Sequence, residues 1–170
     1  LGPEYLQHLD QFTTIFRSPG IPYELPELRA ARAKGILCSS ATALFFEHAK
    51  GTTIGITGTK GKGTTSTLLY QCIKAFGHKK INTFLAGNIG VPAITLLPKL
   101  NDRSLTILEL SSFQLQDLKR SPHIAVVLDI FPDHMDAHDN FAEYLNAKSS
   151  ITKFQTPNDR VFFAAQNGYA

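Results

Sequence analysis

The chain has 170 residues, a hydrophobic fraction of 43%, a charged fraction of 18% and a formal net charge of +3 at pH 7. These values are typical of a globular domain with a sizeable core and exclude an intrinsically disordered chain. No apolar run approaches the roughly 20 residues that cross a bilayer, no signal peptide is recognisable and the basic residues form no stripe, so we expect a cytoplasmic protein that binds neither membranes nor nucleic acids.

The first 50 residues resemble the end of an α/β unit, with helix signals at Pro26 and Gly35. A proline at the first helical position and a glycine after the last one are typical helix boundaries, and Thr42 is expected to cap a second helix. The expected elements are a buried strand over 12–16, a helix over 26–34, a strand over 36–40 and a helix over 42–50.

The remaining residues alternate buried strands with helices, a pattern that predicts βαβ crossovers and a parallel sheet with flanking helices. The expected strands are 52–57, 81–87, 105–110, 124–130 and 160–165. The expected helices are 64–77, 91–100, 111–118 and 139–154. The helix over 64–77 is expected to bury one apolar face made of Leu68, Leu69, Cys72, Ile73 and Phe76.

Two cysteines, Cys38 and Cys72, lie far apart in the sequence. In a chain without an export signal, such residues more often sit reduced in a core than form a disulfide. The start without Met and the abrupt end suggest a piece of a longer polypeptide.

The segment TGTKGKGTT over 57–65 follows a strand and precedes a helix, which is the context of a phosphate-binding loop. Glycines let backbone N–H groups close around phosphate oxygens, and the helix N-terminus adds its positive dipole end. The segment lacks the leading glycine of the common motif and has Gly63 directly after Lys62, so a glycine-rich turn without a ligand is the alternative. The expected nucleotide-binding residues are Gly58, Thr59, Lys60, Gly61, Lys62, Gly63, Thr64 and Thr65.

Five segments together resemble the Mur ligase superfamily: the loop itself, SPGIPYELPELRAARAKGI, AGNIGVPAITLL, LELSSFQL and DHMDAH followed by FAEYLNAK. Their order is that of the branch that adds D-glutamate, whereas the glycine after the loop lysine resembles the folylpolyglutamate synthetase branch. The resemblance implies a P-loop NTPase-like ATP-binding domain over 51–170, preceded over 1–50 by the C-terminal part of a Rossmann-like UDP-binding domain. It also implies a third domain that lies outside this chain.

Glu109 ends a buried strand, and a carboxylate at the carboxyl end of a parallel strand points into the crevice where such sheets bind ligands. The resemblance implies that two Mg²⁺ ions are held by Thr64, Glu109, His134 and a Lys148 carbamylated by CO₂. Thr65 is the alternative to Thr64, and without the resemblance a helical lysine such as Lys148 is a solvated surface residue.

The resemblance further implies a catalytic set of Lys62, Lys148, His134 and Asn88, and a substrate-binding set of Asn88, Ser111 and Gln114. Local turn and cap hydrogen bonds are the alternative role for Asn88, Ser111 and Gln114. The remaining histidines are expected on the surface: His8, His48, His78, His123 and His138.

The implied reaction is ATP-dependent formation of an amide bond between UDP-N-acetylmuramoyl-L-alanine and D-glutamate through an acyl phosphate, by a monomeric protein. We expect the 170-residue chain alone to be inactive, because the third domain contributes to nucleotide and amino-acid binding. Two alternatives stay open: another ligase of the superfamily, such as a folate polyglutamylating enzyme, and a nucleotide-binding domain without catalysis.

Overall fold

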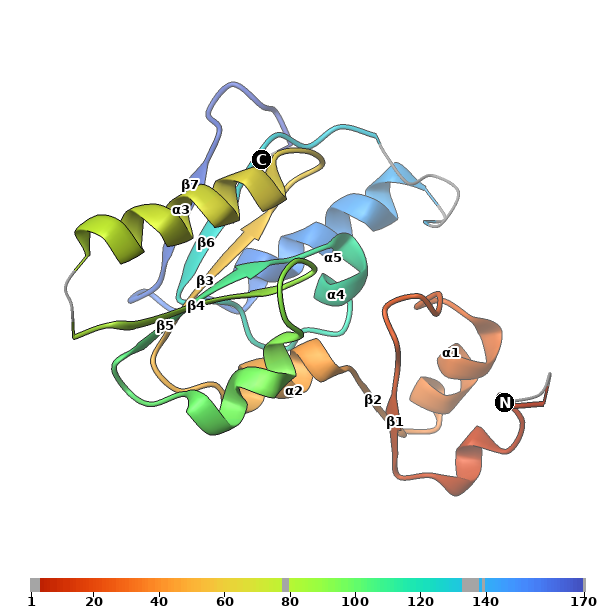
Figure 1. Ribbon diagram of the computed structural model, residues 1–170. Helices are drawn as coiled ribbons and strands as arrows, with labels where there is room; N and C mark the ends of the chain where they lie inside the picture. The colour runs from red at the N-terminus through yellow and green to blue at the C-terminus, as the bar shows by residue number, and fades with distance from the viewer. Residues whose placement is uncertain (1–3, 78–79, 133–137, 139, 170) are drawn as a thin grey trace.

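The computed structural model describes residues 4–77, 80–132, 138 and 140–169 (Figure 1). Two parallel sheets are present among these residues. The small one pairs β1 (Thr14–Phe16) with β2 (Leu37–Ser39), and the large one has the strand order β4-β5-β3-β6-β7. All four neighbouring pairs of the large sheet are parallel, which confirms the predicted α/β fold.

The large sheet is built from strands that the sequence pattern anticipated. They are β3 (Thr52–Thr57), β4 (Asn82–Gly87), β5 (Ser104–Glu109), β6 (Ile124–Val127) and β7 (Arg160–Phe163). The α-helices are α1 (Pro26–Ala33), α2 (Ala41–His48), α3 (Lys62–Phe76), α4 (Ser112–Leu115) and α5 (Phe141–Lys153). Two 3₁₀ helices, η1 (Leu9–Gln11) and η2 (Ala93–Lys99), complete the described elements.

Helices cover both faces of the large sheet (Figure 1). On one face, buried isoleucines of β3 and β5 such as Ile56 and Ile107 pack against α3. On the other face, Leu108 and its neighbours pack against α2, η2, α4 and α5. Ile107 and Leu108 are adjacent in the chain yet belong to opposite cores, as the alternation of side chains along a strand requires.

Several local predictions need correction. The segment 91–100 forms the 3₁₀ helix η2 and not an α-helix, because Pro98 lies inside it and cannot donate a backbone hydrogen bond. The helix expected over 111–118 is a single α-helical turn. Ser40, and not Thr42, caps α2: its hydroxyl accepts a hydrogen bond from the Ala43 amide, while Thr42 is buried inside the helix.

The apolar face predicted for α3 is also partly wrong. Leu69 and Ile73 pack against the core, together with Tyr70, but Leu68, Cys72 and Phe76 are exposed, and Phe76 is 89% accessible. Likewise, the strand predicted as buried over 12–16 leaves Phe12 and Phe16 exposed. In α3, helical periodicity predicted five buried apolar residues, but the face of the helix that contacts the sheet is narrower and buries fewer of them.

A buried ion pair joins the N-terminal segment to the turn after α4. Arg17, directly after β1, donates from Nε and Nη2 to the carboxylate of Asp117 at 3.1 and 2.6 Å. Its Nη2 also donates to the Phe113 carbonyl at 2.7 Å, and its Nη1 donates to the Ile21 carbonyl. Arg17 and Asp117 are 4% and 6% exposed, so this fork is isolated from solvent. The pair fixes residues 17–21 beside α4 and the turn that follows it.

We expect Asp117→Asn or Arg17→Met to lower the free energy of unfolding by about 3–5 kcal/mol, because each leaves one buried charge uncompensated. Urea denaturation measures this loss, and the double variant Arg17→Met/Asp117→Asn should lose less than the sum of the single variants. Losses below about 1 kcal/mol, the range of exposed pairs, would contradict a buried, structure-determining pair.

Both cysteines are free, as predicted, but only Cys38 is half-buried, and Cys72 lies exposed on α3 instead of in a core. Burial raises the pKa of the Cys38 thiol. A thiol with a raised pKa holds less of the reactive thiolate at neutral pH.

A maleimide added near pH 7 should therefore label Cys72 before Cys38, and the labelling of Cys38 should speed up as pH rises. Mass spectrometry of the variants Cys38→Ser and Cys72→Ser assigns the two rates. Faster labelling of Cys38 would contradict the burial described here.

Candidate functional site

The loop over 58–61 connects the central strand β3 to α3, whose first residue is Lys62. It is the middle of the predicted phosphate-binding segment, and we call it the phosphate loop. Gly58 has a φ of +150°, and a Cβ on it would lie 2.7 Å from the Leu128 Cβ. The loop therefore passes too close to the segment after β6 for any side chain at this position. Such packing holds the loop amides at the N-terminus of a 15-residue helix, where an anion is stabilised.

Lys62 folds back over this loop. Its Nζ donates to the carbonyls of Gly58 and Thr59 at 3.2 and 3.0 Å. The Thr59 hydroxyl is buried and bonded to Tyr144 Oη and to the backbone of Phe131, each at 3.0 Å. The Lys62 ammonium group therefore lies against the loop, where it could bind an anion. The Thr59 side chain fixes the loop through its hydrogen bonds to Tyr144 and Phe131.

Glu109 ends β5 at the same edge of the sheet and is 4% exposed. Asn88 donates to it twice: the side-chain amide reaches Oε1 at 3.4 Å and the backbone amide reaches the carbonyl at 3.0 Å. Among the described residues, Glu109 Oε2 has no hydrogen-bond partner. A buried carboxylate oxygen without a partner is costly, which fits a site for a cation that prefers oxygen ligands.

The turn after β4 brings Asn88 to this carboxylate. Gly87 has a φ of +112°, and a Cβ there would lie 2.2 Å from the Glu109 carbonyl oxygen. Only glycine permits this approach of the two strand ends. The segment GNIG therefore has a local structural reason for its first glycine.

A cavity of about 400 Å³ lies at these strand ends. Four of the predicted site residues, Lys62, Asn88, Glu109 and Ser111, line it together. The N-terminal segment contributes the opposite wall, and the full lining is Pro19, Gly20, Pro22, Lys62, Asn88, Glu109, Ser111 and Phe113. The cavity therefore joins the phosphate loop to the segment that Arg17 fixes.

Ser111 and Gln114 form a capping box at the start of α4. The Ser111 hydroxyl accepts from the Gln114 amide, and the Gln114 side-chain oxygen accepts from the Ser111 amide at 3.0 Å. This is the cap role that the sequence left open for both residues. Ser111 also lines the cavity, whereas Gln114 is buried and lies outside its lining.

Lys148 is 3% exposed, so the solvated-surface interpretation is wrong. Its Nζ donates to the Gly58 carbonyl at 2.9 Å and to Thr57 Oγ1 at 3.4 Å, and it lies 4.6 Å from the centre of the Tyr144 ring. Lys148 thus stands directly behind the phosphate loop.

The remaining described residues predicted to bind the nucleotide or a metal ion do not line the cavity at the strand ends. Thr64 is exposed and Thr65 half-buried on the first turn of α3, and Lys60 and Gly61 are exposed in the loop. His134 lies outside the described residues. Within those residues, no group of three His, Cys, Asp or Glu side chains could hold a metal ion.

His138 was predicted on the surface, and this is wrong: it is 4% exposed and hydrogen-bonded on both ring nitrogens. Its partners are Ser112 and Glu143. The sequence carries no local signal for this burial, because Ser112 lies 26 residues away in the chain.

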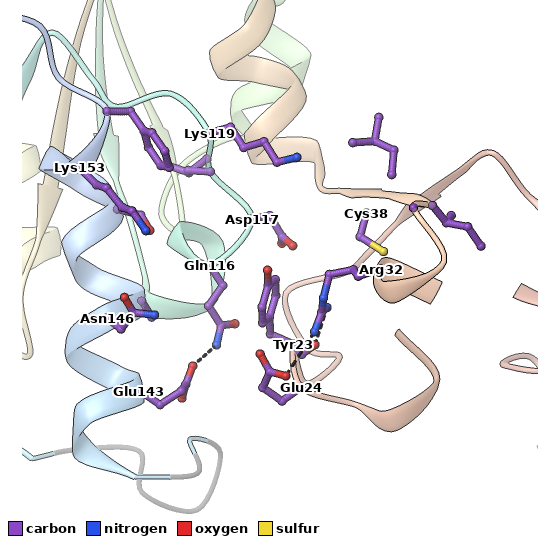
Figure 2. Close-up of a pocket in the computed structure, with 17 residues that line it drawn as sticks. Tyr23, Glu24, Arg32, Cys38, Gln116, Asp117, Lys119, Glu143, Asn146 and Lys153 are labelled. Carbon is purple, nitrogen blue, oxygen red and sulfur yellow. Dashed lines mark hydrogen bonds and ion pairs between the residues drawn. The ribbon is translucent and has the colours of Figure 1, made fainter. Parts of the chain in front are cut away.

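A second cavity of about 520 Å³ lies beyond the C-terminal end of α4. Figure 2 shows Tyr23, Arg32 and Cys38 on one side of it, and Gln116, Asp117 and Lys119 on the other. None of the predicted site residues lines it. The cavity at the strand ends, which four of the predicted site residues line together, is the candidate functional site.

The family model of the Mur ligase middle domain matches residues 56–170. The chain belongs to the Mur ligase family. Among curated relatives of this Mur ligase, UDP-N-acetylmuramoylalanine–D-glutamate ligase of Acetivibrio thermocellus is 39% identical over 98% of the chain. The protein of the same name from Symbiobacterium thermophilum is 42% identical over 93% of it. The chain spans about a third of the length of these relatives, 35% and 34% respectively.

Solved structures agree on the fold. A UDP-N-acetylmuramate:L-alanyl-gamma-D-glutamyl-meso-diaminopimelate ligase from Neisseria meningitides superposes with a TM-score of 0.58 at 17% identity, over 96% of this chain and 56% of that one. MurF from Acinetobacter baumannii gives 0.57 at 17% identity, over 82% and 38%. In the described part of this Mur ligase, no helix is both long and apolar enough for a membrane span.

Gly58 in the phosphate loop and Gly63 in the first turn of α3 give a matched test of this geometry. We expect Gly58→Ala to destabilise the protein by about 1–3 kcal/mol, because the new Cβ meets Leu128 and the φ of +150° is strained. Gly63→Ala should fold normally, since its Cβ would lie 3.5 Å from Glu109 Oε2, an ordinary contact. Thermal unfolding of the two variants measures the difference, and equal stability would contradict the close packing of the loop.

Proposed function

We propose that the parent protein is an ATP-dependent ligase that joins D-glutamate to UDP-N-acetylmuramoyl-L-alanine in peptidoglycan precursor synthesis. The observation that carries the proposal is the meeting of Lys62, Asn88 and Glu109 with Pro19 and Gly20 at one cavity. The names of the relatives at 39% and 42% identity support the choice of substrates.

In this proposal the triphosphate of ATP lies over the loop amides from Gly58 to Thr64. Lys62 turns its ammonium group from the Gly58 and Thr59 carbonyls toward the phosphates and stabilises charge on the transferred group. Glu109 and Thr64 would hold one Mg²⁺ ion, and His134 with Lys148 would hold a second. Positive charge bound by these residues would screen the repulsion between the carboxylate nucleophile and the triphosphate.

Asn88 and Ser111 are proposed to contact the nucleotide-sugar substrate, and Gln114 is proposed to act on it through the capping box that positions Ser111. Asn88 already contacts Glu109, so its amide would orient the substrate carboxylate beside the γ-phosphate. Attack of that carboxylate forms an acyl phosphate and releases ADP. The amine of D-glutamate then attacks the acyl carbon, and phosphate leaves from the tetrahedral intermediate.

Lys148 is proposed to be carbamylated by CO₂. A buried ammonium is costly, and conversion of the amine to a carbamate would give the site an anion for the second Mg²⁺. The new carboxylate would extend past the Gly58 carbonyl that Nζ now contacts.

Residues 1–50 are proposed to be the end of the UDP-binding domain and residues 51–170 part of the ATP-binding domain of a monomeric, cytoplasmic enzyme. Because a third domain is proposed to complete the nucleotide and amino-acid sites, the 170-residue chain alone should not catalyse ligation. D-glutamate-dependent release of ADP by the isolated chain would contradict this.

The decisive assay uses the full-length protein with Mg-ATP and UDP-N-acetylmuramoyl-L-alanine, with and without D-glutamate. Release of ADP that depends on D-glutamate supports the proposal. A parallel reaction with folate and L-glutamate tests the other branch, for which Gly63 is the sequence support. Nucleotide binding without release in either reaction would favour a non-catalytic domain.

Lys62→Ala should lower kcat by about 100- to 1,000-fold, the loss typical of one charge-stabilising donor. Glu109→Gln should raise the Mg²⁺ concentration needed for half-maximal rate, because an amide is a weaker ligand than a carboxylate. Lys119→Ala, in the other cavity, is the control and should leave both quantities unchanged. A wild-type rate for Lys62→Ala would contradict the proposed role of Lys62 in catalysis.

A further inference from the structure

The helix α4 consists of a single turn and lies between the two cavities. Four residues cannot hold a helix by their own hydrogen bonds, so the position of α4 depends on contacts with other elements. Its N-terminal end carries Ser111 and Phe113, which line the candidate substrate cavity. Whatever fixes α4 therefore also fixes one wall of that cavity.

A closed ring of hydrogen bonds clamps α4 to α5. The Ser112 hydroxyl lies 2.9 Å from His138 Nε2, and His138 Nδ1 contacts Glu143 Oε2. The other carboxylate oxygen of Glu143 accepts from Gln116 Nε2 at 2.7 Å (Figure 2). Ser112 begins α4 and Gln116 caps its C-terminal end, so the ring engages both ends of the same turn.

The imidazole of His138 also supports the cavity wall directly. Its ring stacks on the ring of Phe113, with centroids 4.9 Å apart and planes 8° from parallel. Phe113 faces the cavity, so His138 lies behind a residue that substrate would touch. The edge of the Tyr144 ring packs against the same imidazole at 5.1 Å.

The tautomer follows from the partners. A carboxylate only accepts hydrogen bonds, so Nδ1 of His138 carries a hydrogen and donates a hydrogen bond to Glu143. In the neutral ring Nε2 then accepts from the Ser112 hydroxyl, and the two contacts together keep the imidazole in one orientation. A side chain that could satisfy only one of these partners would leave α4 attached at one end.

We propose that His138, together with Glu143, is a positioning residue that sets the wall of the nucleotide-sugar site. It acts through Ser112 and Phe113 and does not itself touch the substrate. This inference rests on the function proposed above, and it predicts an effect on one substrate and not on the other. The nucleotide-sugar substrate should bind more weakly, while ATP, which is proposed to bind across β3 and α3, should not.

The test compares His138→Ala, His138→Asn and Ser112→Ala in the full-length protein. Calorimetric titration with UDP-N-acetylmuramoyl-L-alanine should give a dissociation constant about tenfold higher for His138→Ala, the factor expected for loss of a charge-assisted hydrogen bond. The KM for ATP should stay within about twofold of the wild-type value, because ATP is proposed to bind away from α4. His138→Asn should be rescued in part, since its amide nitrogen can still donate to Glu143.

A double variant separates the ring from independent contacts. Ser112→Ala/His138→Ala should bind no more weakly than His138→Ala, because both changes break the same hydrogen bond. The exposed His48→Asn on α2 is the matched control and should behave as wild type.

Unchanged binding of the nucleotide-sugar substrate by His138→Ala would overturn the inference. Equal weakening of both substrates, with a lowered melting temperature, would also overturn it, because that result indicates a general structural role. If the wild-type protein neither binds the nucleotide-sugar substrate nor releases ADP with D-glutamate, the proposed function itself fails, which is a separate result.

Discussion

The buried pair of Arg17 and Asp117 is the interaction on which the site depends. These residues lie 100 positions apart in the chain, and the fork between them joins the segment after β1 to the turn after α4. Pro19 and Gly20 directly follow this link, and they line the cavity opposite the strand ends of the large sheet. Because the planar guanidinium of Arg17 binds the Asp117 carboxylate through two nitrogens, it fixes the orientation of the two side chains as well as their distance.

The site then follows from the topology of the parallel sheet. The carboxyl ends of β3, β4 and β5 meet at one edge, and each delivers a functional group there: the phosphate loop, Asn88 and Glu109. Two glycines make this convergence possible, because Gly58 and Gly87 pass too close to neighbouring atoms for a side chain. Among the residues that the structure describes, Glu109 Oε2 has no hydrogen-bond partner, which supports the proposal that a cation binds beside it.

Much of this could be predicted from the sequence. Buried runs such as 52–57 and 105–110 have the length and composition of strands in a parallel sheet. A glycine-rich loop between a strand and a helix is typical of phosphate-binding sites. What the sequence could not predict is set by distant partners. The burial of His138 depends on Ser112, that of Arg17 on Asp117, and that of Lys148 on the loop carbonyl of Gly58. Helical periodicity also predicted too many buried residues in α3, because it does not show how much of the helix surface the sheet covers.

The most direct test of the proposed function is a crystal structure of the full-length protein with Mg²⁺, a non-hydrolysable ATP analogue and UDP-N-acetylmuramoyl-L-alanine. We expect the triphosphate to lie over the loop amides, with its γ-phosphate between Lys62 and a Mg²⁺ held by Glu109. We also expect the alanine carboxylate to lie beside Asn88. A triphosphate bound instead in the cavity lined by Arg32 and Lys119, with Glu109 Oε2 still without a partner, would contradict the proposed function.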